Sequence, residues 1–183
     1  MLHRFGLGGL EVAQGRAQVV DALITHLYRM ALERYPARRS SNGRERSRVT
    51  IAAVGGYGRG ELCPCSDVDL LILYDRSSVE FARYLAGEMI YLLWDVGLKV
   101  GHSFRTPEEC LEMARHDSTV ENALLDARHL AGGLEVWQVL RSLLQRYRKR
   151  HSQQFVERIR DEVAGRYYGR LGETVFLQEP NVK

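Results

Sequence analysis

The pattern of apolar and polar positions predicts two neighbouring buried strands near the middle of the chain. The first apolar run covers residues 49–54 and the second covers 70–74, and both are rich in Val, Ile and Leu. Continuous apolar runs of this length are too short for ordinary helices and are typical of strands covered on both faces. Around them, apolar residues recur at helical spacing and predict helices over 10–35, 79–95 and 134–165.

Two further segments extend this pattern. Residues 98–105 are expected to form a third strand, and the segment Thr106–Glu109 combines an N-cap, a proline and two acids, which is typical of a helix start. In the last helix, Phe155, Ile159 and Val163 are spaced four residues apart and are predicted to lie in the core. Strands and helices together indicate an α/β (α+β) fold.

Composition excludes several classes of protein. The chain has 183 residues, of which 45% are hydrophobic and 27% are charged, as in soluble globular proteins. No apolar run approaches the roughly 20 residues needed to span a bilayer, and the N-terminus does not resemble a signal peptide. Three sparse cysteines are typical of a reducing compartment. We therefore expect a cytoplasmic protein with no membrane partner, and the net charge of +3 does not imply a nucleic-acid partner.

Two carboxylates lead into the second apolar run. The order Ser66-Asp67-Val68-Asp69 precedes Leu70 directly. Because strand side chains alternate between faces, Asp67 and Asp69 are expected to point the same way and Val68 into the core. Two adjacent carboxylates repel each other, and a bound Mg²⁺ relieves that repulsion through oxygen ligands. The pair therefore predicts a magnesium site.

A glycine pair ends the first apolar run. Gly55 and Gly56 allow a sharp turn and let an anion approach the main chain. The residues that follow, 57–62, are predicted to start a short helix whose free N–H groups favour phosphate, and Arg59 adds a positive charge. A phosphate-binding turn beside a carboxylate pair indicates a site for a nucleoside triphosphate with Mg²⁺.

These residues resemble a known family. A glycine pair, a gap of ten residues and then Asp-hydrophobic-Asp-hydrophobic is similar to the signature of the polymerase-β-like nucleotidyltransferase superfamily. The longer string GGYGRGEL…SDVDLLIL resembles the N-terminal catalytic domain of the bacterial PII uridylyltransferase (uridylyl-removing enzyme) family. The segments LLWDVGLKVGHSFRT and LQEPNVK, at residues 92–106 and 177–183, agree with that resemblance.

The resemblance implies a fold and a set of domains. The superfamily fold has a small mixed sheet flanked by helices, here with a long C-terminal helical stretch. We expect an N-terminal helix and basic loop over residues 1–48 and a nucleotidyltransferase domain over 49–183. The motif LQEPNVK lies inside the proteins of the family, so the chain is expected to be truncated at its C-terminus. Deuridylylation belongs to other domains of the family and is not expected here.

The resemblance also implies a reaction. UMP would pass from UTP to a tyrosine hydroxyl of the nitrogen-signalling protein PII, with Mg²⁺ present and pyrophosphate released. Asp67 and Asp69 would hold the metal, and the turn at Gly55-Gly56 would bind phosphates. Arg59 would steady the pyrophosphate, while Ser66 would contact a phosphate or cap its own turn.

A third carboxylate is common in the superfamily on the strand beside the Asp pair. Residues 98–105 contain no acid, so this chain departs from the pattern. We slightly favour Asp126 as the third catalytic carboxylate over Glu179, and Glu121 is the weakest candidate because it fits an exposed helix face. The first two remain open to a second interpretation, as salt-bridge partners of Arg105 or Arg128.

Two alternative functions remain open from the sequence. One is an adenylyltransferase or another nucleotidyltransferase on the same fold, because the catalytic strands do not reveal the base that is selected. The other is a nucleotide-binding regulatory module without catalysis. On the predicted third strand, His102 is either a substrate contact or a hydrogen-bonded core residue.

Overall fold

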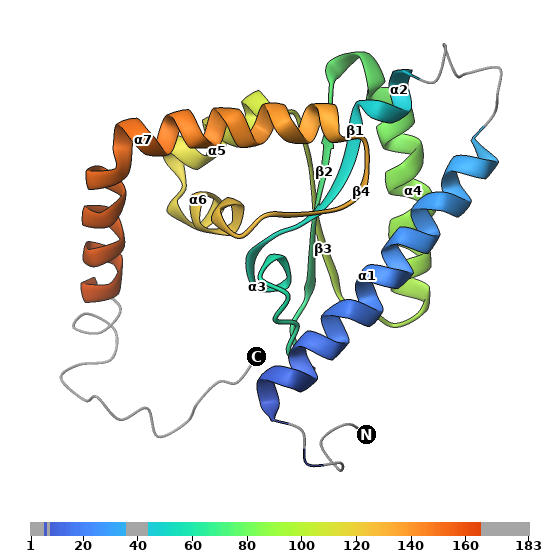
Figure 1. Cartoon of the computed structure of the whole chain (residues 1–183), viewed down its shortest axis with the longest axis horizontal. Coiled ribbons are helices and arrows are strands. Elements are labelled where there is room, and N and C mark those ends of the chain that lie inside the picture. Colours follow the sequence, from blue (N-terminus) through green and yellow to red (C-terminus); the bar gives the residue numbers. More distant parts are fainter. Residues whose placement is uncertain (1–5, 7, 36–43, 166–183) are drawn as a thin grey trace.

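A four-stranded mixed sheet with helices on both faces forms the centre of the structure (Figure 1). The computed structural model describes residues 6, 8–35 and 44–165. The strand order is β3-β2-β1-β4, with β1 antiparallel to both of its neighbours and β2 parallel to β3. This confirms the α/β class. In chain order the elements are α1 (Gly9–Arg34), α2 (Arg44–Ser47), β1 (Val49–Ala53), α3 (Gly55–Gly58), β2 (Val68–Tyr74), η3 (Arg76–Ser78), α4 (Val79–Asp95), β3 (Val100–Arg105), α5 (Pro107–His116), α6 (Ser118–Leu125), β4 (Arg128–Gly132) and α7 (Leu134–Ala164).

Side-chain alternation along β2 divides the core into two layers. Leu70 and Ile72 belong to the apolar cluster that α1 and α4 form on one face of the sheet. Leu71 and Leu73 belong to the cluster built by α5, α6 and α7 on the other face (Figure 1). All four side chains are almost fully buried. The unbroken apolar run therefore reflects a strand covered on both sides, as predicted.

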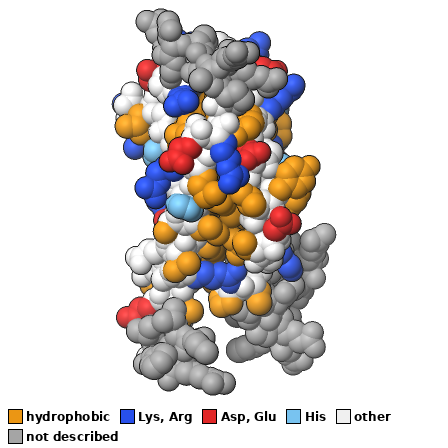
Figure 2. Space-filling model, turned by 90° about the vertical axis from the view of Figure 1, so that its right-hand side faces the viewer, with side chains coloured by type: hydrophobic (Ala, Val, Ile, Leu, Met, Phe, Trp, Pro, Cys, Tyr) orange, Lys and Arg blue, Asp and Glu red, His pale blue; other side chains and the backbone are white. Residues whose placement is uncertain are grey.

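The outer side of α1 and α4 keeps some apolar side chains in contact with solvent. Figure 2 shows this side of the molecule, with apolar side chains gathered between charged ones. Val19 of α1 is 70% exposed, and Tyr91 and Trp94 near the end of α4 are 67% and 46% exposed. The glycine turn and the acidic pair lie elsewhere, at the ends of β1 and β2.

The short helix after β1 begins earlier than predicted. Instead of starting at Tyr57, α3 starts at Gly55, immediately after the strand. Gly55 has φ +58°, a left-handed conformation that favours glycine, and the N–H of Gly58 donates to the Val54 carbonyl at 3.0 Å. The turn closes directly onto the strand end, so the expected span of 57–62 is wrong.

The long C-terminal helix is present but bent. Within α7, His151 has φ −124° and ψ 18°, which is not helical, and the axis turns there (Figure 1). Beyond the bend Phe155 and Ile159 are only half-buried, and Val163 is 46% exposed. The prediction that Val163 lies in the core is therefore wrong, because none of the described elements covers that side of the helix after the bend.

The predicted helix start at residue 106 is confirmed. Thr106 caps α5 by accepting a hydrogen bond from the Glu109 N–H at 3.3 Å, and the Glu109 carboxylate accepts one from the Thr106 N–H at 2.8 Å. This reciprocal capping box fixes where β3 ends and the helix begins. The cavity described below opens beside that strand.

A second glycine pair brings the end of β4 against the start of β1. The N–H of Gly133 donates to the Val49 carbonyl at 2.8 Å, and a Cβ at Gly133 would lie 1.8 Å from the Ser47 carbonyl oxygen. The Ser47 backbone leaves no room for a side chain at Gly133. The entry into α7 therefore depends on this glycine.

We expect Gly133→Ala to lower the free energy of unfolding by about 3 kcal/mol, because the methyl group forces two backbone segments apart. Urea unfolding followed by circular dichroism measures the change. Gly87→Ala in α4 is the matched control, since a Cβ there meets nothing within 4 Å. The control should raise stability by up to about 1 kcal/mol through helix propensity. Equal midpoints for wild type and Gly133→Ala would contradict the prediction.

Candidate active site

The glycine turn and one carboxylate of the acidic pair lie side by side. Val54, the last residue before α3, donates its N–H to the Asp69 carbonyl at 3.1 Å. A Cβ at Gly55 would lie 3.9 Å from Asp69 Oδ2. Antiparallel pairing of β1 with β2 thus brings together two motifs that are separated by ten residues in the sequence. Gly56 follows in the first turn of α3, where backbone N–H groups lack intrahelical acceptors.

The acidic pair points away from the core, as alternation predicts. Val68 is fully buried, while Asp67 and Asp69 on either side of it are exposed. The pKa of Asp69 is raised above its ordinary value, chiefly because the strand end removes water from one side of the carboxylate and secondly because Asp67 is negatively charged. A cation bound between the two carboxylates would remove the second cause of the raised pKa, the repulsion from Asp67.

The third strand contributes a glycine beside Asp69. Gly101 is paired in register with Asp69, and a Cβ at Gly101 would lie 2.6 Å from Asp69 Oδ1. The Asp69 carboxylate therefore occupies the space that a side chain at residue 101 would need. Close packing of this carboxylate over β3 gives a physical reason for the absence of an acid at this position.

A cavity of about 380 Å³ opens beside Asp69, between β3 and α6. Its volume is within the range of about 300–1,000 Å³ seen for small-molecule sites. His102 lies at its edge, is exposed and contacts the Trp94 ring with a centroid distance of 6.1 Å, so the core interpretation of this histidine is wrong. The polar side chains that line the cavity are Asp69, His102, Ser103, Arg105 and Thr119.

Asp126, the favoured third carboxylate, lies beside the glycine turn but is already paired. It caps the end of α6, and its Oδ2 accepts a hydrogen bond from Arg59 Nη1 at 2.7 Å. A Cβ at Gly58 would lie 2.2 Å from the Asp126 carbonyl oxygen, so a glycine is needed for this approach. The salt-bridge interpretation holds with a different partner, because Asp126 binds Arg59 rather than Arg105 or Arg128.

The other candidates for the third carboxylate are placed differently. Glu121 is only 3% exposed and forms an ion pair with Arg158 of α7, so its assignment to an exposed helix face is wrong. Glu179 lies outside the described residues. Within residues 6, 8–35 and 44–165, no group of three or more His, Cys, Asp or Glu side chains is arranged to hold a metal. The catalytic role of Asp126 stays a prediction.

Arg59 and Ser66 flank the site from two loops. Arg59 donates to Glu61 Oε2 at 3.1 Å as well as to Asp126, and these two hydrogen bonds, that to Asp126 first, raise the pKa of the guanidinium. Ser66 is half-buried, and its N–H donates to the Cys63 carbonyl at 3.0 Å, which closes the turn before the acidic pair. Any phosphate bound by Arg59 would therefore compete with two carboxylates.

A hydrogen-bond network behind the glycine turn was not predicted from the sequence. Asp21 of α1 accepts hydrogen bonds from the Tyr57 hydroxyl at 2.7 Å and from Arg128 Nη1 at 2.7 Å. Arg128 also donates to the carbonyls of Gly58 at 3.1 Å and Tyr57 at 3.2 Å. Two elements far apart in the sequence, α1 and β4, thus hold α3 from behind. The local sequence hints at this network only through Tyr57, a large side chain between two glycines, which is 1% exposed in the fold.

The residues present fit a magnesium ion. Asp67 and Asp69 offer carboxylate oxygens, which Mg²⁺ prefers, and this ion usually takes one or two carboxylates together with substrate phosphates. Burial is the main cause of the raised pKa of Asp69 and repulsion from Asp67 the second, and a divalent cation would offset the second. The nearby backbone turn at Gly55 suits the phosphates.

The raised pKa of Asp69 predicts a pH-dependent cost to stability. The ordinary value of 3.8 is raised by folding, so near neutral pH the folded chain holds an ionised carboxylate at a cost in free energy. We expect Asp69→Asn to melt at a higher temperature than wild type at about pH 7 in the presence of a chelator. The gain should begin to shrink as the pH falls through the raised pKa, because the folded state then takes up the proton, and it should vanish below the ordinary value of 3.8, where both states are protonated.

Melting curves recorded at about pH 7 and about pH 4 measure this effect. Asp95→Asn is the control, since Asp95 is an exposed carboxylate at the end of α4. Its difference from wild type should not change with pH in the same way. An Asp69→Asn variant that is less stable than wild type at neutral pH would show that the assigned cost is absent.

Comparisons with known proteins identify the family. Residues 38–128 match the family model described as a nucleotidyltransferase domain. The chain is 37% identical over 185 residues to a bifunctional uridylyltransferase/uridylyl-removing enzyme of Phenylobacterium zucineum, covering 97% of this chain and 19% of that protein. Proteins of the same name from Methylococcus capsulatus and Cereibacter sphaeroides are 42% and 39% identical, covering 88% and 93% of this chain and 18% of each relative.

The chain thus spans about a fifth of the length of these curated relatives. No helix among the described residues is long and apolar enough to cross a membrane. The mixed sheet, the glycine turn and the acidic pair lie within or directly beside the matched range, and they are consistent with the polymerase-β-like nucleotidyltransferase fold. Over residues 38–128 the chain belongs to the nucleotidyltransferase domain family, and over most of its length it is similar to bifunctional uridylyltransferase/uridylyl-removing enzymes.

Proposed function

We propose that this chain transfers UMP from UTP to a tyrosine hydroxyl of a PII-type signalling protein, in a Mg²⁺-dependent reaction that releases pyrophosphate. The observation that carries the proposal is the contact between Gly55 and Asp69 at the ends of neighbouring strands, inside the residues that match the nucleotidyltransferase domain. The relatives are uridylyltransferases by name, which supports UMP as the transferred group. The acceptor protein follows from the resemblance of the motifs, and a cytoplasmic location is part of the proposal.

The residues around the turn have separate roles in this proposal. Backbone N–H groups at Gly55 and Gly56 bind the β and γ phosphates, because the first turn of a helix leaves its donors without intrahelical acceptors and this turn lies beside Asp69. Asp67 and Asp69 hold the metal, and Ser66 supports the turn that presents them. When bound, Mg²⁺ neutralises charge that develops on the transferring phosphoryl group.

Arg59 and Asp126 take part as a pair. The acceptor hydroxyl attacks the α phosphorus in line, and the bond from that phosphorus to the pyrophosphate oxygen breaks. Arg59 binds the phosphates of UTP before the attack and then steadies the departing pyrophosphate, so the bound phosphates draw the guanidinium away from Asp126 and Glu61 before the proton moves. Asp126 is then free to serve as the third carboxylate and to accept the proton of the hydroxyl. In the structure Asp126 is bound to Arg59, so this role depends on the exchange.

Two rival functions give different results in one assay. Purified PII protein is incubated with the chain, Mg²⁺ and each of UTP, ATP, GTP and CTP, and pyrophosphate release and the mass of PII are measured. We expect UTP to be the preferred donor and PII to gain one UMP, with no gain when its acceptor tyrosine is replaced by phenylalanine. Preference for ATP would indicate an adenylyltransferase and overturn the proposal.

A regulatory module without catalysis is the second rival. It is supported by the lack of a three-residue metal cluster among the described residues. Such a module would bind a nucleoside triphosphate with Mg²⁺ but release no pyrophosphate with any acceptor. Calorimetric titration of UTP with and without Mg²⁺ separates this outcome from a chain that does not bind nucleotides at all.

A further inference from the structure

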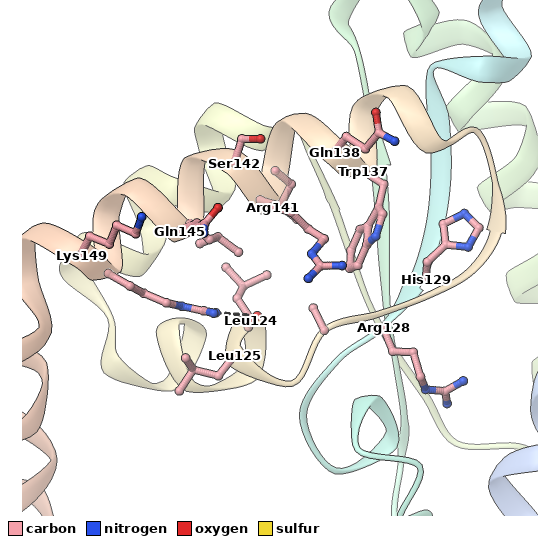
Figure 3. A pocket seen from close by; sticks show the side chains of 14 residues that line it. Leu124, Leu125, Arg128, His129, Trp137, Gln138, Arg141, Ser142, Gln145 and Lys149 are labelled. Carbon is pink, nitrogen blue, oxygen red and sulfur yellow. Dashed lines mark hydrogen bonds between the residues drawn. The ribbon is translucent and has the colours of Figure 1, made fainter.

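A second and larger cavity lies away from the acidic pair. It has a volume of about 850 Å³ and opens between α7 on one side and α6 with the start of β4 on the other (Figure 3). It shares only Leu124 with the cavity beside Asp69. We call it the basic cleft, and it is lined by Leu124, Leu125, Ala127, Arg128, His129, Trp137, Gln138, Leu140, Arg141, Ser142, Leu144, Gln145, Arg148 and Lys149.

The lining of the basic cleft is positively charged and contains no acid. Four of its side chains are Arg or Lys, and none is Asp or Glu. Arg128 is bound to Asp21 and points away from the cleft (Figure 3). The other three cations, Arg141, Arg148 and Lys149, all come from α7, so one helix carries the positive charge of the cleft.

The carboxylates nearest to these cations are already paired with other arginines. Glu121 and Asp126 both act electrostatically on Arg148. Glu121 forms its ion pair with Arg158, and Asp126 forms its own with Arg59. Neither carboxylate lines the cleft, so both act on Arg148 from outside it while they are engaged by other arginines.

The positive charge of Arg141 also disfavours the charged form of Arg148. The pKa of Arg148 is lowered, first by partial burial and also by the positive charge of Arg141. Arg148 Nη2 donates one hydrogen bond, to the Leu124 carbonyl at 3.2 Å, which leaves its other N–H groups available. Arg141 points into the cleft next to Trp137, and no ion pair holds it within the described residues (Figure 3).

We propose that the basic cleft binds a phosphate-bearing small molecule of nucleotide size, at a site separate from the turn at Gly55 and Asp69. Guanidinium groups bind phosphate oxygens through paired hydrogen bonds, and a phosphate would offset the repulsion between Arg141 and Arg148. Next to Arg141, the His129 and Trp137 rings have a centroid distance of 6.1 Å and form an aromatic part of the lining, the aromatic wall. The volume of about 850 Å³ is that of a small-molecule site.

Two sources share this phosphate chemistry, a nucleotide and free inorganic pyrophosphate. Calorimetric titration of the full chain with UMP and, separately, with pyrophosphate distinguishes them. A chelator is present and the Asp69→Asn background is used, which removes the metal site from the measurement. Tighter binding of UMP identifies a nucleotide site that uses the aromatic wall. Equal or tighter binding of pyrophosphate identifies a site for the free anion, and both results support a phosphate site.

Arg141→Gln tests where the ligand is held. We expect this variant to weaken binding by about tenfold, because a hydrogen-bonded charge pair with the phosphate is lost. Arg150→Gln is the matched control: it removes the same charge from an exposed position of α7 that does not line the cleft, and binding should stay within about twofold of wild type. Arg141 is exposed, so its replacement should not disturb folding, which a melting curve confirms.

Three results would overturn the proposal. One is no binding of either probe in the Asp69→Asn background. Another is an equal loss for Arg141→Gln and Arg150→Gln, which indicates a general effect of positive charge. The last is binding of an acidic peptide that depends on Arg141 while UMP and pyrophosphate do not bind, since the cleft would then take an acidic protein. The titration needs neither metal nor transfer, so its outcome does not depend on the function proposed above.

Discussion

Under the proposed function, Asp69→Asn is expected to reduce UMP transfer by about a thousandfold or more. A metal held by the acidic pair contributes several kcal/mol of charge stabilisation at the transition state, and each 1.36 kcal/mol corresponds to about tenfold in rate. Asn keeps the size of the side chain but removes the charge that holds the cation. Asp69 also lies against Gly55 and Gly101, so its carboxylate is the one fixed between the glycine turn and β3.

Radioactive UMP incorporation into PII measures the loss, with Asp95→Asn as the control because Asp95 is exposed at the C-terminal end of α4 and does not line the cavity beside Asp69. A second measurement separates metal binding from chemistry. The melting temperature of wild type should rise with Mg²⁺ and UTP, and the rise should be absent in Asp67→Asn/Asp69→Asn. Transfer by Asp69→Asn within tenfold of wild type would remove Asp69 from the metal site.

Short-range features of the site were predictable from the sequence. Continuous apolar runs require strands covered on both faces, and β1 and β2 are such strands. Strand alternation places Val68 in the core and leaves Asp67 and Asp69 outside. Because a turn and a strand start meet when neighbouring strands pair, the motif spacing already indicated that Gly55 and Asp69 lie together. Each of these inferences depends on local geometry alone.

Features that depend on packing between distant elements were not predictable. The partner of Asp126 is Arg59, because the end of α6 approaches Gly58, and no local pattern encodes that approach. The helical periodicity predicts that Glu121 is exposed, yet the bent α7 brings Arg158 into an ion pair with it. Val163 continues an apolar stripe that no described element covers. In all three cases the tertiary arrangement decides what the periodicity leaves open.

Arg128→Gln is expected to lower the free energy of unfolding by about 2 kcal/mol and to weaken nucleotide binding by about tenfold. The stability loss follows from the charge-assisted hydrogen bonds to Asp21, reduced by the partial exposure of both side chains. The binding loss follows because Arg128 holds the carbonyls of Tyr57 and Gly58, which end α3. When phosphate binds, a loosened turn must be ordered again, and the free-energy cost of that ordering lowers the affinity.

Lysine is not expected to restore the contacts of Arg128. Arg128 donates to three groups at once from one planar fork, whereas the single ammonium of Arg128→Lys reaches Asp21 without also meeting both carbonyls. Arg128→Lys is therefore expected to recover part of the stability but little of the nucleotide affinity. Tyr57→Phe, which removes only the hydroxyl that donates to Asp21, should cost about 1 kcal/mol of stability.

A double-mutant cycle decides whether these groups act as one unit. Asp21→Asn combined with Arg128→Gln should show a coupling energy of about 1 to 2 kcal/mol in urea unfolding, because each single change removes the same contact. The exposed pair of Arg34 and Glu88, with 3.8 Å between its charged atoms, serves as the reference cycle and should couple by less than about 0.5 kcal/mol. Additive effects of Asp21→Asn and Arg128→Gln on the free energy of unfolding would show that this network does not hold the glycine turn. A loss of UTP affinity in Arg34→Gln equal to that in Arg128→Gln would show the same. Coupling in both stability and UTP affinity would instead extend the nucleotide site to α1 and β4, behind the turn that the motif defines.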